Sequence, residues 1–339
     1  MRRLFVLLCI AAQVLVLGVM AGEREYILAN GKTVFLRTAP IDPRDPFRGD
    51  FVRLSYEIDR VAHEQLRGGL ADPKHEARKG DRVYAALTEG ADDVYALDYV
   101  SDLKPAEGVF LRGRLLRDWR GTRGRGDIAV KYGIEQLFVE QGTGRDIESR
   151  RGTRTGLQVP MEVEVAVGTG GTAVIRGFRW SKLGTGLKML RFNRRPRNAN
   201  LDTLDEPLSP KLQITLQNVS DAPLVIADPG EHCGFHLRKT TRVSRHYRPA
   251  YDGCRDVPVS AGDLITLAPG EAYTVELDLS NPRWYVEVDG NIGEIGRYAN
   301  NDSFRMVYQA PEASLALTGD MLWRGALATS AFTAFQVID

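Results

Sequence analysis

Acidic and basic side chains gather in residues 40–50 (PIDPRDPFRGD), a short segment that also holds three prolines. Its carboxylates belong to Asp42, Asp45 and Asp50, and its guanidinium groups to Arg44 and Arg48. Carboxylates that converge in a cleft can act as general acid and base, which would suit the hydrolysis of a polymer. The same groups could instead form salt bridges or, in the case of Asp50, accept backbone N–H groups and fix a turn. The sequence favours this structural role.

Other residues of catalytic type give weaker signals. Ser55 could act as a nucleophile only beside a buried lysine, and the nearest candidate, Lys131, has no supporting motif. Glu135 and Glu140 could form an acid–base pair, but alternation along a strand places them on opposite faces. The sequence contains neither a phosphate-binding loop nor a nucleophile elbow. We therefore expect no catalytic residues and no cofactor.

Two of the three cysteines, Cys233 and Cys254, lie far from the N-terminal Cys9. In an exported domain they fit one disulfide, which would close a loop of about twenty residues and stabilise the fold by roughly 3 kcal/mol. Two free buried thiols are the alternative. A metal site would have to draw on His232, Cys233, His236 and His246. Because a disulfide would remove one of these ligands, we predict no metal.

A strand must position the charged segment. From Phe51 onward the residues alternate, with Val52, Leu54, Tyr56 and Ile58 on one apolar face, which predicts a half-buried strand. The preceding prolines favour extended backbone, and Gly49 can adopt the positive φ of a turn. The charged segment should therefore be a loop at the start of this strand.

Residues 49–56 read Gly-Asp-aromatic-x-x-Leu-x-Tyr, which resembles the signature of the bacterial GDYXXLXY family, with Phe51 in place of its usual Tyr. Residues 42–45 (DPRD), 132–135 (YGIE), 138–140 (FVE) and the glycines 142 and 144 fit as well, whereas 139–142 (VEQG) depart from the family's usual VPEG. The resemblance covers roughly residues 1–180 and implies an N-terminal membrane anchor. It makes these motif residues candidates for binding: Asp42, Arg44, Asp45, Arg48, Gly49, Asp50, Phe51, Leu54, Tyr56, Tyr132 and Glu135.

Residues 4–22 form an apolar run that is interrupted by Gln13 and preceded by Arg2 and Arg3. A cleavable signal peptide that ends near residues 19–21 is one interpretation. The other is a single transmembrane helix, because the run is close to the ~20 residues that span a bilayer. We expect residues 1–22 to be a retained anchor in the inner membrane, with the bulk of the chain in the periplasm.

Short strands separated by turn signals make the chain mostly β. We expect a β-barrel-like domain over residues 23–192, a linker over 193–210 and an immunoglobulin-like sandwich over 211–339. With 339 residues and 43% hydrophobic residues the chain is long enough for two cores, and its net charge of +1 argues against a nucleic-acid partner.

Residues 176–197 carry eight basic residues, no acidic ones, and interleaved aromatic and aliphatic side chains. This pattern predicts either contact with anionic lipid or a solvated strand and linker. Together with the anchor and the two β domains, it suggests a non-enzymatic accessory or binding protein with a membrane-protein partner. The alternative is an envelope-polymer hydrolase that uses Asp42, Asp45 and Asp50.

Overall fold

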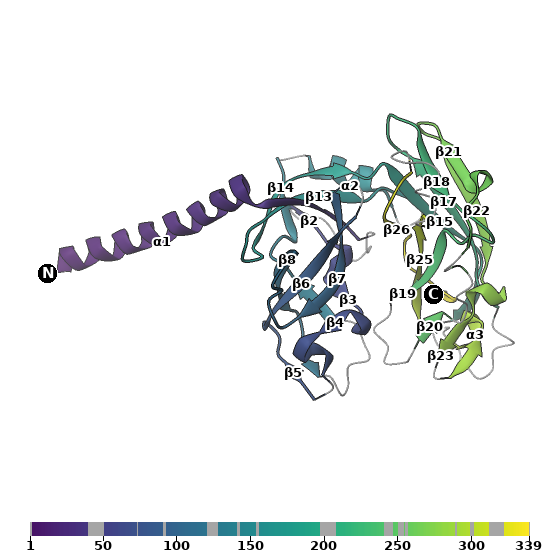
Figure 1. The fold of residues 1–339 in the computed structure, drawn as a ribbon, viewed down its shortest axis with the longest axis horizontal. Coiled ribbons are helices and arrows are strands. Elements are labelled where there is room, and N and C mark those ends of the chain that lie inside the picture. The colour runs from purple at the N-terminus through teal and green to yellow at the C-terminus, as the bar shows by residue number, and fades with distance from the viewer. Residues whose placement is uncertain are drawn as a thin grey trace.

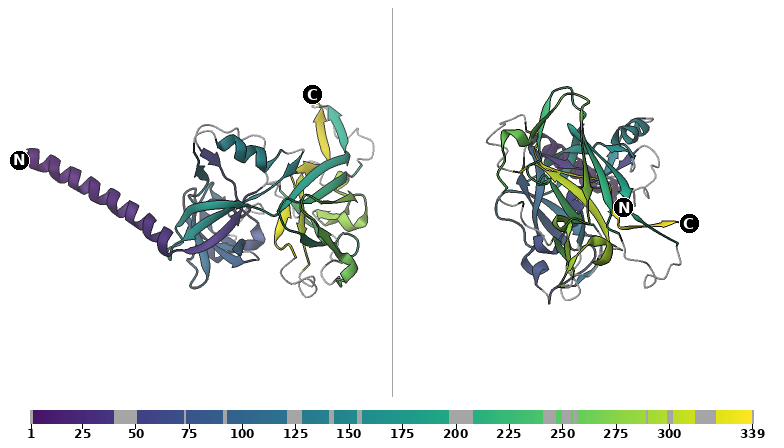
Figure 2. Two further views of the ribbon diagram at one scale, coloured as in Figure 1. Left: turned by 90° about the horizontal axis from the view of Figure 1, so that it is seen from above. Right: turned by 90° about the vertical axis from the view of Figure 1, so that its right-hand side faces the viewer.

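The computed structural model describes residues 2–39, 51–72, 74–90, 93–120, 128–140, 143–153, 156–196, 208–240, 247–249, 254, 257–288, 290–298, 302–311 and 322–338. The chain is mostly β-structure and begins with one long apolar helix, as the sequence predicts (Figure 1). Two β-rich halves lie side by side, and the helix projects away from both (Figure 2).

Helix α1 (Arg2–Asn30) continues without a break past the predicted end of the anchor at Gly22. Its segment Phe5–Asn30 is long and apolar enough to cross a membrane, and none of its apolar 18-residue window is buried by the rest of the chain. At about 1.5 Å per residue, α1 exceeds the ~30 Å hydrocarbon core of a bilayer.

The last turn of α1 packs directly on the first sheet. Ile27 is buried, and its carbonyl accepts the N–H of Gly31 at 2.7 Å. Arg176 donates to the carbonyl of Leu28 and to the hydroxyl of Thr33. A side chain at Gly31 would meet the Ile27 carbonyl oxygen at 2.6 Å, so glycine allows the close approach between helix and strand. The helix therefore joins the sheet without a linker.

In the described residues the first half contains a nine-stranded mixed sheet, ordered β14-β13-β1-β7-β6-β8-β10-β3 with β4 beside β7. Its strands are β1 (Lys32–Arg37), β3 (Arg60–Val61), β4 (Leu66–Arg67), β6 (Arg82–Glu89), β7 (Val94–Ser101), β8 (Val109–Leu115), β10 (Ile128–Lys131), β13 (Met161–Val167) and β14 (Ala173–Trp180). All pairs are antiparallel except β1–β7 and β4–β7.

The described strands do not close into the barrel that their regular spacing predicted. Strands β14 and β3 end the hydrogen-bonded path, and no described pair joins them. Strand β1, which follows the anchor helix, is inserted between β13 and β7 and is parallel to β7. An up-and-down β-barrel needs antiparallel neighbours with a fixed stagger between every pair of strands. Alternation in the sequence does not specify that stagger.

Smaller elements complete the first half. They are β2 (Phe51–Arg53) paired with β11 (Gln136–Phe138), β5 (Glu76–Ala77) paired with β9 (Trp119–Arg120), helix α2 (Gly144–Arg151), and the 3₁₀ turns η1 (Glu57–Asp59), η2 (His63–Gln65) and η3 (Gly68–Ala71). One buried cluster, which includes Leu36, Leu54, Leu111 and Met161, forms the core of this half.

The second half is built from several small sheets around a separate core. The largest is β12 (Leu157–Gln158), β15 (Leu183–Arg191), β17 (Lys211–Asn218) and β22 (Ala272–Asp278). Opposite it lie β19 (Phe235–Lys239), β25 (Ser303–Gln309), β26 (Ala326–Ala328) and β27 (Phe332–Thr333). The remaining elements are β18 (Leu224–Ala227), β21 (Leu264–Leu267), β20 (Tyr247–Pro249), β23 (Val286–Val288), β24 (Asn291–Gly293), β16 (Asn193–Pro196), β28 (Phe335–Ile338), α3 (Ile295–Tyr298), η6 (Ala261–Asp263) and η7 (Pro282–Trp284).

Most strands predicted in the second half are present, at β17, β21, β22 and β25. Trp284 and Trp323 are buried in its core, as the sequence predicts for core side chains. Strand β15, which was expected in the first domain, pairs with β17 along its whole length, and Leu183 belongs to the second core. The immunoglobulin-like topology and the domain limits stay predictions.

A buried ion pair joins the two halves. Arg37 of β1 donates to Glu162 of β13 at 2.7 Å and to the Ala326 carbonyl of β26 at 2.6 Å. Its guanidinium also lies 5.1 Å from the centre of the Trp323 ring. Glu162 accepts a second bond, at 2.8 Å, from Arg179 of β14. Arg37 thus links the first sheet to the second half, as does Arg60 of β3, which donates to the Thr240 carbonyl at 3.2 Å.

Candidate functional site

The structure describes part of the predicted motif. Gly49 and the charged residues Asp42, Arg44, Asp45, Arg48 and Asp50 lie outside the described residues, and of Phe51 only the backbone, in β2, is described. The other four, Leu54, Tyr56, Tyr132 and Glu135, meet at one place in the first core. The backbone N–H of Leu54 donates to the carbonyl of Glu135 at 2.9 Å, which joins the two motif segments.

Two buried tyrosines hold these segments together reciprocally. The hydroxyl of Tyr56 donates to the carbonyl of Ile134 at 2.8 Å, in the segment of Tyr132. The hydroxyl of Tyr132 donates to the carbonyl of Ile58 at 2.9 Å, in the segment of Tyr56. Each ring fills the core while its hydroxyl satisfies a buried backbone oxygen of the other segment.

A carboxylate caps each tyrosine's own turn. Glu135 accepts the backbone N–H of Tyr132 at 2.6 Å and that of Gly133, which has φ +85°, at 3.1 Å. Asp59 accepts the backbone N–H of Tyr56 at 2.7 Å and the hydroxyl of Ser55 at 3.2 Å. Sequence reasoning missed Asp59, although an acceptor three residues after the start of a turn is a capping signal.

The pKa values of this cluster are raised chiefly by burial. Burial, followed by the charges of Asp59 and Glu135, raises the pKa of Tyr56 and of Tyr132 well above the usual range. Burial raises the pKa of Asp59 to about 7, and the Glu135 charge adds to this, while the Tyr56 N–H and the Ser55 hydroxyl oppose it. The tyrosines therefore stay neutral donors, and Asp59 titrates near neutral pH.

The geometry favours a structural use of the motif over a catalytic one. The Ser55 hydroxyl bonds Asp59, and Lys131 is exposed, so Ser55 lacks the buried lysine that a nucleophile there would need. Glu135 caps a turn before β11, and exposed Glu140 follows that strand, so they form no shared acid–base pair. One oxygen of Asp59, Oδ1, is buried without a hydrogen-bond partner among the described residues. Because this oxygen has no described partner, Asp59 is the residue of the cluster that is best suited to take part in a reaction.

Loss of either tyrosine hydroxyl will destabilise the fold. We expect Tyr56→Phe and Tyr132→Phe each to lower the free energy of unfolding by about 1–3 kcal/mol, because each leaves a buried carbonyl unsatisfied. The two effects will not add, since both hydroxyls fasten the same two segments. Urea denaturation of the two variants and the double variant measures this coupling. Tyr84→Phe, which removes a hydroxyl without a described partner, should be nearly neutral.

Asp59→Asn will change the pH dependence of stability. A carboxyl whose pKa rises on folding contributes stability below its unfolded pKa of about 4 and loses it as pH rises through about 7. Asn keeps an acceptor for the Tyr56 N–H but carries no charge. As the pH rises from 4 to 8, the free energy of unfolding of the variant should therefore increase by about 2 kcal/mol relative to that of the parent, allowing for the partial exposure of Asp59. Parallel pH profiles of parent and variant would contradict the assignment.

The second half contains the predicted disulfide. Cys233 and Cys254 are bonded, with their Cα atoms 5.3 Å apart. This bond rules out the metal site that needed Cys233 as a ligand, and His246 lies outside the described residues. The described residues hold no group of three or more His, Cys, Asp or Glu side chains arranged to bind a metal.

The basic stretch 176–197 is divided between the two halves. Arg176 lies beside Glu164, Arg179 bonds Glu162, and Arg191 of β15 bonds Asp278 at 2.5 Å. Several of its basic groups are thus used inside the protein. Strand β14 begins next to the end of α1 and runs away from it, because Ala173 pairs with Val167, which in turn pairs with Lys32.

Comparison with protein families gives one match, to the family described as GDYXXLXY protein, over residues 13–178. The match runs from the middle of α1 to β14, and so includes the helix end, the nine-stranded sheet and both motif segments. No curated protein and no solved structure matches the chain.

Proposed function

Because residues 13–178 match the GDYXXLXY family, we propose that the protein is a non-enzymatic accessory or binding protein, anchored in the inner membrane by α1 and facing the periplasm. The observation that carries the proposal is the junction of helix and sheet. Ile27, beyond the predicted cleavage region, belongs to α1 and is buried against the first sheet, and its carbonyl accepts the N–H of Gly31, which directly precedes β1. An anchor that is integral to the fold favours retention over cleavage.

Two further features support the orientation. Arg2 and Arg3 precede the apolar run, and positive residues favour the cytoplasmic side. The Cys233–Cys254 disulfide suits an oxidising compartment beyond the membrane. We further propose a membrane-protein partner, an immunoglobulin-like sandwich for the second half, and lipid contact through the basic stretch near Arg176, where β14 adjoins α1.

We propose a non-enzymatic role because of the contacts that the motif residues make. Tyr56, Tyr132 and Glu135 all serve backbone contacts between two segments, which is what a scaffold needs. One observation favours the alternative, an envelope-polymer hydrolase: Asp59, whose pKa of about 7 suits proton transfer at neutral pH, follows Asp42, Asp45 and Asp50 closely in the sequence.

Membrane fractionation with mass determination of the mature N-terminus tests the anchor. We expect the chain to keep residues 1–22 and to resist alkaline extraction from the membrane. A soluble product beginning near Gly22 would overturn the anchor. Envelope-polymer hydrolysis that is lost in Asp59→Asn and in Asp45→Asn, while both variants stay folded, would replace the accessory role with the hydrolase.

A further inference from the structure

The two cysteines of the disulfide differ in their access to solvent. Cys233 is 5% exposed, whereas Cys254 is only partly buried. Exchange with a thiol begins when a thiolate attacks one sulfur of a disulfide, so it depends on which sulfur can be reached. An incoming thiolate reaches Cys254 more easily, and Cys233 is then the sulfur that leaves when the bond breaks.

A guanidinium lies against the more accessible sulfur. One nitrogen of Arg283 donates to the Cys254 sulfur at 2.5 Å. Another donates to the carbonyls of His232 and Phe235, at 3.1 Å and 3.2 Å. The backbone N–H of Arg283 donates to the side chain of Asn281 at 3.0 Å, so the arginine is held at both ends. Because a cation beside a sulfur favours the thiolate over the thiol, Arg283 stabilises the form that Cys254 takes after reduction.

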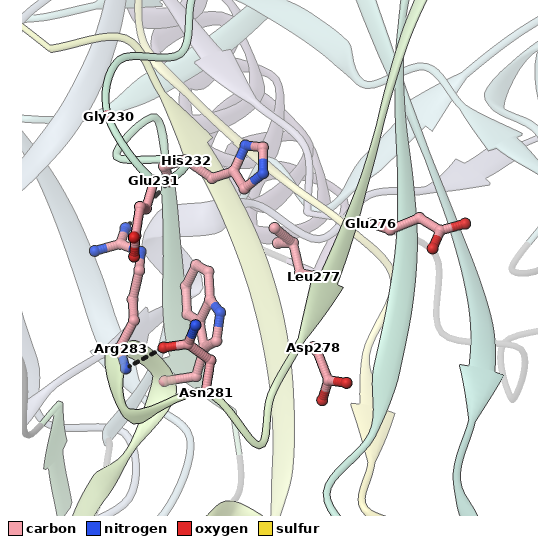
Figure 3. A pocket seen from close by; sticks show the side chains of 9 residues that line it. Gly230, Glu231, His232, Glu276, Leu277, Asp278, Asn281 and Arg283 are labelled. Carbon is pink, nitrogen blue, oxygen red and sulfur yellow. Dashed lines mark hydrogen bonds between the residues drawn. The ribbon is translucent and has the colours of Figure 1, made fainter.

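A cavity of about 410 Å³ adjoins the disulfide. The loop at 230–232 and Arg283 form one side of it, and residues 276–278 of β22 form the other (Figure 3). Gly230 lies close to the bond, because a side chain there would come within 3.7 Å of the Cys233 sulfur. Gly230 and Arg283, which adjoin the two sulfurs, thus both line the cavity. It provides room beside the disulfide for the molecule that carries an incoming thiol.

Three carboxylates share the cavity with this guanidinium, and two of them are paired elsewhere. Glu276 pairs with Lys211 at 2.7 Å, and Asp278 pairs with Arg191 at 2.5 Å. The third, Glu231, lies on the same side of the cavity as the guanidinium but is exposed to solvent, which screens its charge (Figure 3). Within the described residues, the guanidinium is therefore the charge that contacts the disulfide directly, and Glu231 opposes it only in part.

The loop around Cys233 also has contacts that do not depend on the disulfide. The N–H of Cys233 donates to the Pro229 carbonyl at 2.9 Å. The buried carboxylate of Asp228 accepts the N–H of Gly234 at 3.2 Å and lies 2.8 Å from Nδ1 of His232. These contacts keep Cys233 in place after the bond opens, while the guanidinium holds the other sulfur. The reduced form thus keeps its two sulfurs close together, as a reversible exchange requires.

We propose that the Cys233–Cys254 disulfide is a site of thiol exchange. A thiolate RS⁻ attacks the Cys254 sulfur, forms a mixed disulfide with it and displaces Cys233 as a thiolate, which takes up a proton. A second thiolate attacks the sulfur of R in the mixed disulfide, and Cys254 leaves as a thiolate beside Arg283. Two thiols are thereby oxidised to RSSR, and the protein disulfide takes up their two electrons. Of their two protons, one stays on Cys233 and one passes to solvent. This chemistry is independent of the proposed binding role.

The test uses the full chain in membranes, with Cys9→Ser to remove the remaining thiol, at equilibrium with reduced and oxidised glutathione. Alkylation followed by mass determination gives the reduced fraction and the mixed disulfide. We expect reduction at millimolar glutathione. Arg283→Gln should lower the equilibrium constant for reduction roughly tenfold, the worth of one charge-assisted hydrogen bond. Arg283→Lys, which keeps the charge, should restore most of it. Glu231→Gln removes an opposing charge and should raise the constant.

The thiolate itself gives a readout that a purely structural role of the arginine would not change. The reduced parent should show the ultraviolet absorbance of a thiolate at neutral pH, and Arg283→Gln should lose it while it stays folded. A cysteine peptide in place of glutathione distinguishes the source of the thiol. Faster reaction of the peptide at equal thiolate concentration supports exchange with a protein, and faster reaction of glutathione supports exchange with a small thiol.

Two single-serine variants form a matched pair. Cys233→Ser leaves the more accessible sulfur and should capture glutathione as a mixed disulfide, whereas Cys254→Ser leaves the buried one and should not. A chain that stays oxidised in millimolar reduced glutathione, equal capture by both serine variants, or an equilibrium constant that neither Arg283→Gln nor Glu231→Gln changes would each overturn the proposal. Should Arg283→Gln unfold, Arg283→Lys and Glu231→Gln decide. The anchor is tested separately by the mature N-terminus, so either proposal can fail alone.

Discussion

Glu162→Ala will lower the free energy of unfolding by about 3–5 kcal/mol, the typical cost of removing one partner from a buried ion pair. The variant leaves the guanidinium of Arg37, which is 5% exposed, with one carbonyl and one aromatic ring as its contacts. Because Arg37 also fastens Ala326 and Trp323 of the second half, the loss should loosen the junction between the halves. Thermal and urea denaturation of the full chain measure the change.

A matched control lies two residues along the same strand. Glu164 lies 3.8 Å from Arg176, and both side chains are partly exposed. Glu164→Ala should therefore cost less than about 1 kcal/mol, as exposed pairs do. If the two alanine variants lose equal stability, the buried pair does not carry the junction, and other contacts, such as the bond from Arg60 to the Thr240 carbonyl, would have to carry it instead.

Removal of the disulfide will have the second large effect. Replacing Cys233 and Cys254 with serine opens a loop with a sequence separation of 21. The chain-entropy treatment gives a loss of about 3 kcal/mol for such a loop. Denaturation with and without a reductant measures the loss, which should appear in the parent on reduction and be absent in the double-serine variant.

Cys9→Ser provides the control for this measurement. Cys9 is the free, exposed cysteine among the described residues and lies in the apolar part of α1. It takes no part in the packed halves, so its replacement should leave stability and its response to reductant unchanged. A parent whose stability is unaffected by full reduction would show that Arg283 and the Asp228 contacts hold the loop without the disulfide.

Where alternation was clear, the sequence predicted burial well but not the length of the strand, because β2 ends at Arg53 and the 3₁₀ turn η1 begins at Glu57. Leu54, Tyr56 and Ile58 were placed on one apolar face, and all three are buried. The pairing of Cys233 with Cys254 followed from the number of cysteines and the export signal. The reciprocal bonds of Tyr56 and Tyr132 could not be predicted, because 76 residues separate them and only tertiary register brings each hydroxyl to the other's turn.

For a related reason, the sequence could not predict whether the first sheet closes or which sheet a given strand joins. Periodicity shows which side of a strand is buried but not which neighbour it pairs with. The residues of β15 were expected to belong to the first domain, yet Thr185 and Leu187 pair with β17 of the second half.

The junction at Ile27 and Gly31 has a mechanical consequence. A flexible linker would let the folded part change its position and orientation relative to the bilayer, whereas a helix that is continuous with the sheet restricts both. Tilt or rotation of α1 within the lipid is then transmitted as a turn of the whole sheet and, through Arg37, of the second half.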